Sequence, residues 1–599
     1  MAKKYNAVVN SEKDVSQTFI KGAAILTLSM VIVKVFGLLD KVILANIYSL
    51  YGDQYATMGM GLYSNAFEIF VVIFTVATGG LPIAISRLIS ESMAEKRYND
   101  TRLIHKISVP FFVAVGIICF FIMVFGGLIY VNYIIKSPYS VYAMMCLAPT
   151  VLFGCLVSIY RGYFEGQRNM LPTAISEIIE AGVKLVFGAL FAYLIMKYGM
   201  AYYNDHGTVF GLVCESKAVA QNTILAFSVA GAIMGISLGS FCAFIFLLLK
   251  YKIGGDGIPE EYYQTSIHAR SKRETFKRII KTAIPIATGA LVMSLGSLID
   301  QIIIQRIILQ IANDNPDVLY NQYKQYFPKE VFYSQPITIH TQLWGCYSAS
   351  LTLMQLVTAV TQVFGSSAMP NVTSAWTRGN KDELKRSVET VIRMTMMFTL
   401  PMSFGLCVLA HPIMQFIYSS QAFIDIGGNV LTLMGLTTLF TASVTPICSM
   451  LQGIGKVSYP MRLYALCMVI KICTTWIFVS IPTVNIQGAT MGSMIAYAVV
   501  LVIGMYLLIK HSKVIPNFFA TVIKPFAGSL FSSATAYFAN MLFSNLMPQR
   551  LSTIVSIILA VIVYIIALLV MRAFTANEIK FLPKGEKIVK LLEKYHLIG

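Results

Sequence analysis

The sequence has few charged residues and lacks the motifs of ATP-driven or hydrolytic machines. Only 12% of its 599 residues are Asp, Glu, Lys or Arg, about half the share of a typical soluble protein. We find no GxxxxGK[ST] phosphate loop and no HExxH zinc motif. The ten cysteines stand singly, without CxxC or Cys/His ligand spacing, so no metal site is expected. These absences favour a protein that is not an enzyme.

Long apolar segments recur along the whole sequence. Hydrophobic residues make up 56% of the chain and the mean hydropathy is +0.70. An α-helix needs about 20 apolar residues to cross the hydrocarbon core of a bilayer. The sequence therefore predicts an all-α polytopic membrane protein with fourteen transmembrane helices. The first apolar run is expected to be a transmembrane helix and not a cleaved signal peptide. The expected spans are residues 19–48, 62–91, 107–135, 140–160, 171–196, 218–249, 282–312, 342–376, 388–417, 426–451, 457–483, 486–509, 519–546 and 551–571.

The basic residues predict how these spans are oriented. With both termini on the cytoplasmic side, the inner segments and the inner ends of the adjoining spans hold 33 of the 46 Lys and Arg residues, and the outer segments hold six. Basic residues concentrate on the cytoplasmic side of membrane proteins, so both termini are expected to be cytoplasmic. The net charge of +18 is spread over short inner loops, where anionic lipid headgroups are the expected partner rather than nucleic acid.

Internal similarity predicts two copies of a six-helix unit. Pro82 in LPIAIS matches Pro370 in MPNVTS, and Lys184 matches Lys471 at nearly the same separation. Asp40 in GLLDKVIL matches Asp300 in GSLIDQIII. Corresponding spans cross in the same direction, which makes this a parallel repeat. The expected regions are a cytoplasmic tail (1–18), an N-lobe (19–252), a basic cytoplasmic linker (253–281), a C-lobe (282–512), two further helices (513–575) and a cytoplasmic tail (576–599).

The last segment, EKIVKLLEKYHL from Glu586, has apolar residues on one helical face and lysines elsewhere. It fits an amphipathic helix on the inner membrane surface. A solvated tail helix fits the pattern equally well. Gly231, Gly235 and Gly239 have the spacing of a helix-packing face, which we favour over a phosphate loop.

Ionisable residues inside the spans are the candidate functional residues, because charges in the bilayer are costly and usually face a partner or a cavity. Lys34, Lys184 and Lys471 fall near mid-span, and Lys41 shares a helical face with Lys34. The others lie nearer the span ends or beside possible partners: Arg87, Asp40, Glu68, Glu180, Asp300 and Arg306.

Structural ion pairs are the alternative interpretation of several of these charges. Glu180 and Lys184 have the i, i+4 spacing of an intrahelical salt bridge. Asp40 is expected to pair between helices or lobes, with Arg306 or Lys41 as partner. Lys34 and Lys471 have no acidic residue within four positions, so they need a partner from another helix or an anionic ligand.

Two stretches carry a family resemblance: FIKGAAILTLSMVIVKVFGLLDKVIL from Phe19 and MGLYSNAFEIFVVIFTVATGGLPIAISRLISE from Met60. With the 6 + 6 + 2 helix pattern, they resemble the multidrug/oligosaccharidyl-lipid/polysaccharide exporter superfamily. Within it they are similar to the stage V sporulation protein B-like branch and to MurJ-type lipid II flippases. The resemblance implies a multi-pass protein of the bacterial cytoplasmic membrane that moves an undecaprenyl-pyrophosphate-linked saccharide outward by alternating access.

The resemblance also implies roles for the intramembrane charges. Lys34 matches a basic cavity position of MurJ-type proteins, whereas Asp40 stands where they carry a basic residue. Lys34, Lys41, Arg87, Lys184 and Lys471 are the expected pyrophosphate ligands. Gating, charge pairing or ion coupling is expected of the acids and the remaining arginine: Asp40, Glu68, Glu180, Asp300 and Arg306.

Energy coupling and substrate stay open at this stage. Membrane potential, Na⁺ or H⁺ all fit these charges, no cofactor is expected, and a monomer is expected. A flippase for another lipid-linked polysaccharide and a cation-coupled multidrug exporter are alternatives. A membrane enzyme would need a larger outer domain than the longest outer loop, about residues 313–341.

Overall fold

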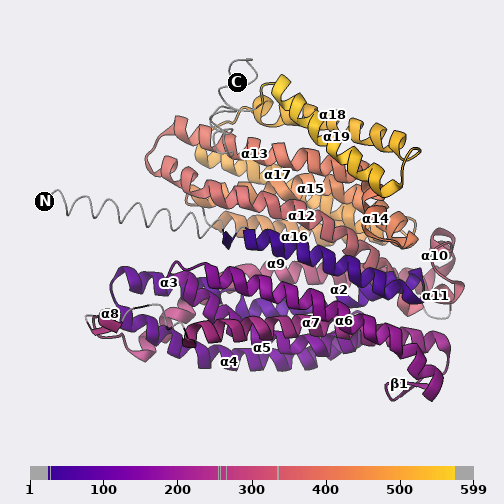
Figure 1. Cartoon of the computed structure of the whole chain (residues 1–599). Coiled ribbons are helices and arrows are strands. Elements are labelled where there is room, and N and C mark those ends of the chain that lie inside the picture. Colours follow the sequence, from indigo (N-terminus) through magenta and orange to yellow (C-terminus); the bar gives the residue numbers. More distant parts are fainter. Residues whose placement is uncertain are drawn as a thin grey trace. The chain divides into compact units, whose positions relative to one another are not determined.

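The computed structural model describes residues 25–573, apart from 27, 254, 256, 257, 259, 265, 334, 335 and 457. Long helices dominate this part of the chain (Figure 1). Twelve helices of the described chain are long and apolar enough to span a bilayer. The predicted all-α polytopic membrane fold is therefore confirmed at that level. The expected tails at 1–18 and 576–599, with the amphipathic segment after Glu586, lie outside the described residues.

The elements of the first half follow the predicted spans. The first helix covers residues 28–48 and runs into the 3₁₀ turn η1 (Ser49–Tyr51). The next elements are α2 (Asp53–Thr78), α3 (Leu81–Ala94), α4 (Tyr98–Ile129), η2 (Tyr130–Ile134), η3 (Pro138–Ser140), α5 (Val141–Gly166), α6 (Leu171–His206), α7 (Lys217–Ile253), α8 (Glu260–Gln264) and α9 (Lys272–Asp314). Between α6 and α7, β1 (Thr208–Val209) pairs antiparallel with β2 (Leu212–Val213).

The second half contains α10 (Pro316–Tyr323), α11 (Lys329–Tyr333), α12 (Pro336–Thr377), α13 (Lys381–Val408), α14 (Ala410–Ile417), η4 (Phe423–Gly427), α15 (Gly428–Gly453), α16 (Ser458–Val479), α17 (Ile486–Ser512), η5 (Phe519–Ile523), α18 (Lys524–Phe543) and α19 (Gln549–Val570). Asn380 caps α13 by accepting a hydrogen bond from the Glu383 backbone N–H at 3.1 Å. Such a cap satisfies one of the backbone donors left open at a helix start.

Two of the fourteen predicted spans are missing from the twelve candidates. They correspond to the helix over 28–48 and to α18. Both are helical, and the first is apolar apart from three charged residues, Lys34, Asp40 and Lys41, which exclude it from the candidates. Hydropathy and length thus support twelve of the spans.

The described chain falls into two compact units, Met1–Ile302 (unit 1) and Ile303–Gly599 (unit 2). The division lies inside α9, whereas the sequence analysis begins the C-lobe at residue 282. The first part of α9 belongs to unit 1 because it makes specific polar contacts there. Arg278 Nη2 lies 2.6 Å from Glu91 Oε1 of α3, and the Gln301 side-chain amide donates to Asn65 Oδ1 of α2 at 2.9 Å.

Glycines allow α6 and α7 to pack backbone against backbone in unit 1. A Cβ on Gly235 would lie 2.6 Å from Gly188 Cα, and one on Gly239 would lie 2.5 Å from the Glu180 carbonyl oxygen. This confirms the helix-packing interpretation of these glycines. The intervening GISLG matches the letters of a GxSxG nucleophile motif, but Ser237 lies inside α7 and donates to the Cys146 carbonyl.

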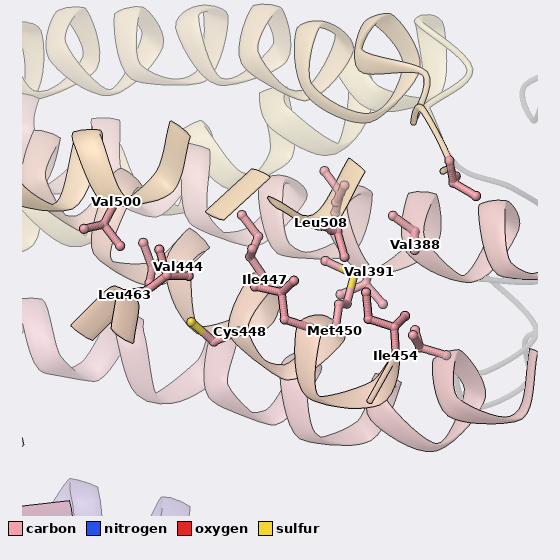
Figure 2. Close-up of a cluster of buried hydrophobic side chains, with 14 of the residues drawn as sticks. Val388, Val391, Val444, Ile447, Cys448, Met450, Ile454, Leu463, Val500 and Leu508 are labelled. Atoms are coloured by element: carbon pink, nitrogen blue, oxygen red, sulfur yellow. The ribbon is translucent and has the colours of Figure 1, made fainter. Parts of the chain in front are cut away.

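A buried apolar cluster holds unit 2 together. Its side chains come mainly from α13, α15, α16 and α17, and they interlock along the helix faces (Figure 2). Val388 and Val391 of α13 belong to this cluster together with Ile447 and Met450 of α15. Lipid is as apolar as these side chains, so close van der Waals packing supplies most of the cohesion between membrane helices.

Hydrogen bonds and ion pairs hold the segment before α9 against the start of α4 in unit 1. Asp100, only 2% exposed, accepts a hydrogen bond from Arg97 Nε at 2.8 Å and from the Arg270 backbone N–H at 2.7 Å. Arg270 also lies 2.8 Å from Glu95. The hydrogen bond to Asp100 raises the pKa of the Arg97 guanidinium above its usual value, so this guanidinium stays charged at neutral pH.

Candidate functional site

A buried ion pair joins the first helix of unit 1 to α6. Lys184 Nζ lies 3.0 Å from Asp40 Oδ2, and the Asp40 side chain is 2% exposed. The Lys184 side chain keeps 22% of its surface exposed. The sequence predicts an interhelical partner for Asp40, and the structure supplies one, Lys184, that the sequence analysis did not consider.

Glu180 has different partners, although it lies one turn before Lys184 in α6. Its carboxylate is 2.9 Å from Arg161 Nη2 of α5 and accepts a hydrogen bond from the Ser240 hydroxyl of α7. The intrahelical Glu180–Lys184 pair, one interpretation of the sequence, is therefore wrong. The predicted span 140–160 ends one residue before Arg161, whereas α5 continues to Gly166 and so includes this arginine.

Lys41 lies at the centre of a wider group of charges. It interacts electrostatically with Lys184, Glu68, Asp40 and Lys34, which come from three helices of unit 1. We call these five residues the unit-1 charge cluster. Its three lysines and two carboxylates leave one net positive charge, and its helices are those expected to cross the membrane. Such a cluster favours an anionic ligand over a cationic one.

Lys34 is the most accessible cation of the unit-1 charge cluster. Its side chain is exposed, and within the described part of the chain it makes no hydrogen bond or ion pair. Lys184 is engaged by Asp40, and Lys41 is partly buried among its neighbours. The cluster thus combines one exposed ammonium group with one that is paired with Asp40 and one that is partly buried among other charges.

Aromatic side chains border the Asp40–Lys184 pair. The ring of Tyr63, a buried residue of α2, has its centroid 5.8 Å from Lys184 Nζ. Tyr48, fully buried at the end of the first helix, packs on α2 at Gly59, where a Cβ would collide with its ring. These rings displace water beside the pair, and a lower local dielectric strengthens its electrostatic interactions.

The remaining predicted site residues lie outside this cluster. Arg87 is exposed on α3, and the part of the chain that the structure describes offers it no ion-pair partner. Asp300, 5% exposed, lies in the unit-1 part of α9. Arg306 is exposed on the unit-2 part of α9, and Lys471 is partly buried on α16 of unit 2.

Unit 2 contains an apolar pocket that the sequence analysis missed. Its volume is about 640 Å³, and α13, α18 and α19 supply most of its wall, including Met397, Pro401, Ala536, Val561 and Leu568. The hydroxyls in the wall bond to backbone carbonyls: Tyr564 donates to Met397 and Ser532 donates to Ala560. The pocket therefore offers almost only hydrocarbon surface. Hydropathy cannot predict it, because lipid-facing and pocket-facing apolar residues look alike in sequence.

Two family models match the sequence. The model described as "Polysaccharide biosynthesis protein" matches residues 19–312, and the model described as "MatE" matches residues 344–477. The first covers the helices of the unit-1 charge cluster, and the second covers α13, α15 and α16.

Two curated relatives from Bacillus subtilis (strain 168) match nearly the whole length. Stage V sporulation protein B is 21% identical over 576 residues, which cover 95% of this chain and 98% of the relative. The lipid II flippase MurJ is 20% identical over 513 residues, covering 83% and 84% respectively.

Among solved structures, the inward closed conformation of the lipid II flippase MurJ is similar in fold. The TM-score is 0.58 at 14% identity, covering 90% of this chain and 97% of that one. At this identity the likeness concerns the fold alone.

Proposed function

Because this chain belongs to the multidrug/oligosaccharidyl-lipid/polysaccharide exporter superfamily, we propose that it is a lipid-linked saccharide flippase. Its proposed substrate is an undecaprenyl-pyrophosphate-linked saccharide, and most specifically the peptidoglycan precursor lipid II. It carries this substrate from the inner to the outer leaflet of the bacterial cytoplasmic membrane by alternating access, without acting as an enzyme.

The observation that carries this proposal is the unit-1 charge cluster. A pyrophosphate bears two or more negative charges, and lysines in a poorly solvated site compensate them with charge-assisted hydrogen bonds. Lys34 offers an ammonium group without an ion pair in the described chain, with Lys41 and Lys184 nearby. Lysine presents a flexible point charge, which suits a ligand that must be bound and then released.

Other cations extend this proposal along the transport path. Arg87 and Lys471 are proposed to contact the pyrophosphate in other states of the cycle. Glu68, Glu180, Asp300 and Arg306 are proposed to serve charge pairing, gating or ion coupling. The energy source is proposed to be the membrane potential or a coupled Na⁺ or H⁺ gradient.

The proposed architecture completes the predicted topology. The helix over 28–48 and α18 are proposed to cross the membrane with the twelve candidate spans, giving fourteen crossings with both termini cytoplasmic. The crossings form two six-helix lobes related by a parallel repeat, plus two C-terminal helices. The protein is proposed to act as a monomer and to meet anionic lipids through its inner loops.

The apolar pocket of unit 2 supports a lipid-linked substrate over a soluble saccharide. Its wall of α13, α18 and α19 side chains can take hydrocarbon without desolvating a polar group. A chain of isoprene units gains from burial in such a pocket only through packing, because the lipid that it leaves is equally apolar.

A cation-coupled multidrug exporter is the alternative function, because the MatE model also matches this chain. Such a pump requires carboxylates open to its organic cations. Asp40 instead is buried against Lys184, and the cluster around it is net positive. This arrangement supports an anionic substrate.

Transport into vesicles tests the proposal. Purified full-length protein is reconstituted into liposomes that contain labelled lipid II, and externally accessible label is followed with time. We expect faster exchange between leaflets than in empty liposomes, and no acceleration of an undecaprenyl-phosphate-linked sugar, which lacks the pyrophosphate. Acceleration of another pyrophosphate-linked glycan but not of lipid II would reassign the saccharide. No acceleration of any pyrophosphate-linked lipid would contradict the proposed function.

A further inference from the structure

We propose that Asp40 is an internal competitor for the substrate's pyrophosphate at Lys184. In the empty transporter the Asp40 carboxylate occupies the ammonium group, and the incoming pyrophosphate displaces it. This inference rests on the proposed function and deepens it, because it assigns a role to an acid within an otherwise cationic site.

The local contacts leave Asp40 as the acid that competes for Lys184. Glu180, the nearest carboxylate along α6, is held by Arg161 and by the Ser240 hydroxyl. Asp40 contacts Lys184 directly at 3.0 Å. A ligand anion that reaches the partly exposed Lys184 side chain meets the Asp40 carboxylate already on the ammonium group, and in this proposal it replaces that carboxylate.

The same contacts explain how Asp40 can release Lys184. A buried carboxylate that loses its only cation is strongly destabilised. Lys41 follows Asp40 in the chain and already interacts with it electrostatically. When pyrophosphate takes Lys184, Lys41 stays beside the carboxylate, so the displaced acid keeps a compensating charge. The exchange then costs less than the loss of an isolated buried pair.

The competing Asp40 carboxylate lowers the affinity of the site for pyrophosphate. The pyrophosphate displaces a single carboxylate because it carries more negative charge. Its net binding free energy is smaller than it would be without Asp40, because the Asp40–Lys184 pair must first be broken. After release, the Asp40 carboxylate returns to Lys184 and prevents an uncompensated ammonium group in the membrane. Removal of the Asp40 charge should therefore tighten substrate binding, whereas loss of an ordinary structural acid should weaken it or leave it unchanged.

The test measures undecaprenyl pyrophosphate binding to the full-length protein in detergent by native mass spectrometry, with uncharged undecaprenol as the reference lipid. We expect Asp40→Asn to lower the Kd for undecaprenyl pyrophosphate by roughly tenfold, the equivalent of about 1.4 kcal/mol. Asp40→Glu retains the competing charge and should stay near the wild-type Kd. If Asp40→Asn does not accumulate, Asp40→Ser removes the same charge.

Glu177→Gln is the matched control. Glu177→Gln removes one negative charge from α6, where Glu177 accepts a hydrogen bond from Ser29 at 3.0 Å and pairs with no lysine among the described residues. Equal tightening by Glu177→Gln would show a general charge effect and overturn the inference. An unchanged or weaker Kd in Asp40→Asn, with normal wild-type binding, would also overturn it and leave the proposed function intact. Equal binding of undecaprenyl pyrophosphate and undecaprenol by every variant would remove the proposed function and this inference together.

Discussion

Lys184 of α6 lies 3.0 Å from Asp40 of the first helix, although Glu180 is only one turn away in its own helix. The contact ties the first helix to α6 through charge. It forms because Glu180 faces α5 and α7, where Arg161 and Ser240 hold its carboxylate. Each of the two acids thus has its own cation, and both pairs join different helices of unit 1.

Replacement of Lys34 by Ala should abolish flipping while leaving expression and folding unchanged. Lys34 is exposed and makes no ion pair in the described chain. Its removal therefore leaves no buried carboxylate without its cation. The measurement is lipid II exchange in liposomes, with the thermal unfolding midpoint as a check on folding. Lys197→Ala is a matched control, because Lys197 lies over the Tyr193 and Tyr198 rings near the far end of α6. Wild-type exchange in Lys34→Ala would remove this residue from the site.

Lys471→Ala should likewise lose activity if the lysines of the two repeat copies share one role. Lys471 is partly buried on α16, at the position that corresponds to Lys184 in the repeat. The same liposome assay measures the effect. Lys456→Ala, in the loop between α15 and α16 of unit 2, is the comparison variant. Normal exchange in Lys471→Ala would restrict the pyrophosphate site to unit 1.

Asp100→Ala should destabilise unit 1 by about 1.5–3 kcal/mol, the usual worth of hydrogen bonds to a charged group, since the two partly exposed arginines lose their shared buried acceptor. Asp100 binds Arg97 and both the backbone and the side chain of Arg270. Chemical unfolding of the purified protein measures the loss. Glu274→Ala is the control, because Glu274 is 56% exposed and 3.8 Å from Arg270. An equal effect of the two substitutions would contradict the role assigned to the buried acid.

Gly235→Ala should destabilise the α6–α7 contact by about 1–3 kcal/mol, because overpacking forces the backbones apart. The new Cβ would lie 2.6 Å from Gly188, where no side chain can move aside. Gly182→Ala on α6 meets only a Phe36 ring atom at 3.8 Å and should be neutral or slightly stabilising. Unfolding midpoints of both variants check this. Similar midpoints would contradict the close packing of the two helices.

The sequence predicts the fold more fully than the site. Hydropathy places the long helices because crossing the bilayer imposes a length and an apolar composition. The helix over 28–48 lies in the predicted span 19–48 but is not among the twelve candidates, because it carries three charged residues, Lys34, Asp40 and Lys41. The glycine spacing at Gly235 and Gly239 predicts packing correctly because close backbone approach requires a missing side chain.

The charge pairs are harder to predict because helix spacing shows only neighbours within one helix. The i, i+4 rule points to Glu180 for Lys184, but the actual partners lie on other helices. Arg161 was missed because hydropathy ends the span before α5 ends. The apolar pocket of unit 2 has no sequence signal of its own, since its wall has the same composition as a lipid-facing surface.

The central claim, that this protein flips a pyrophosphate-linked saccharide lipid through its cationic cluster, is tested most directly by lipid II exchange in liposomes. The compared proteins are the wild type, Lys34→Ala and Lys197→Ala, each reconstituted at equal amounts. The account predicts rapid exchange for the wild type and Lys197→Ala, and exchange at the protein-free rate for Lys34→Ala. Equal exchange by all three proteins, or none above the protein-free rate, would contradict it.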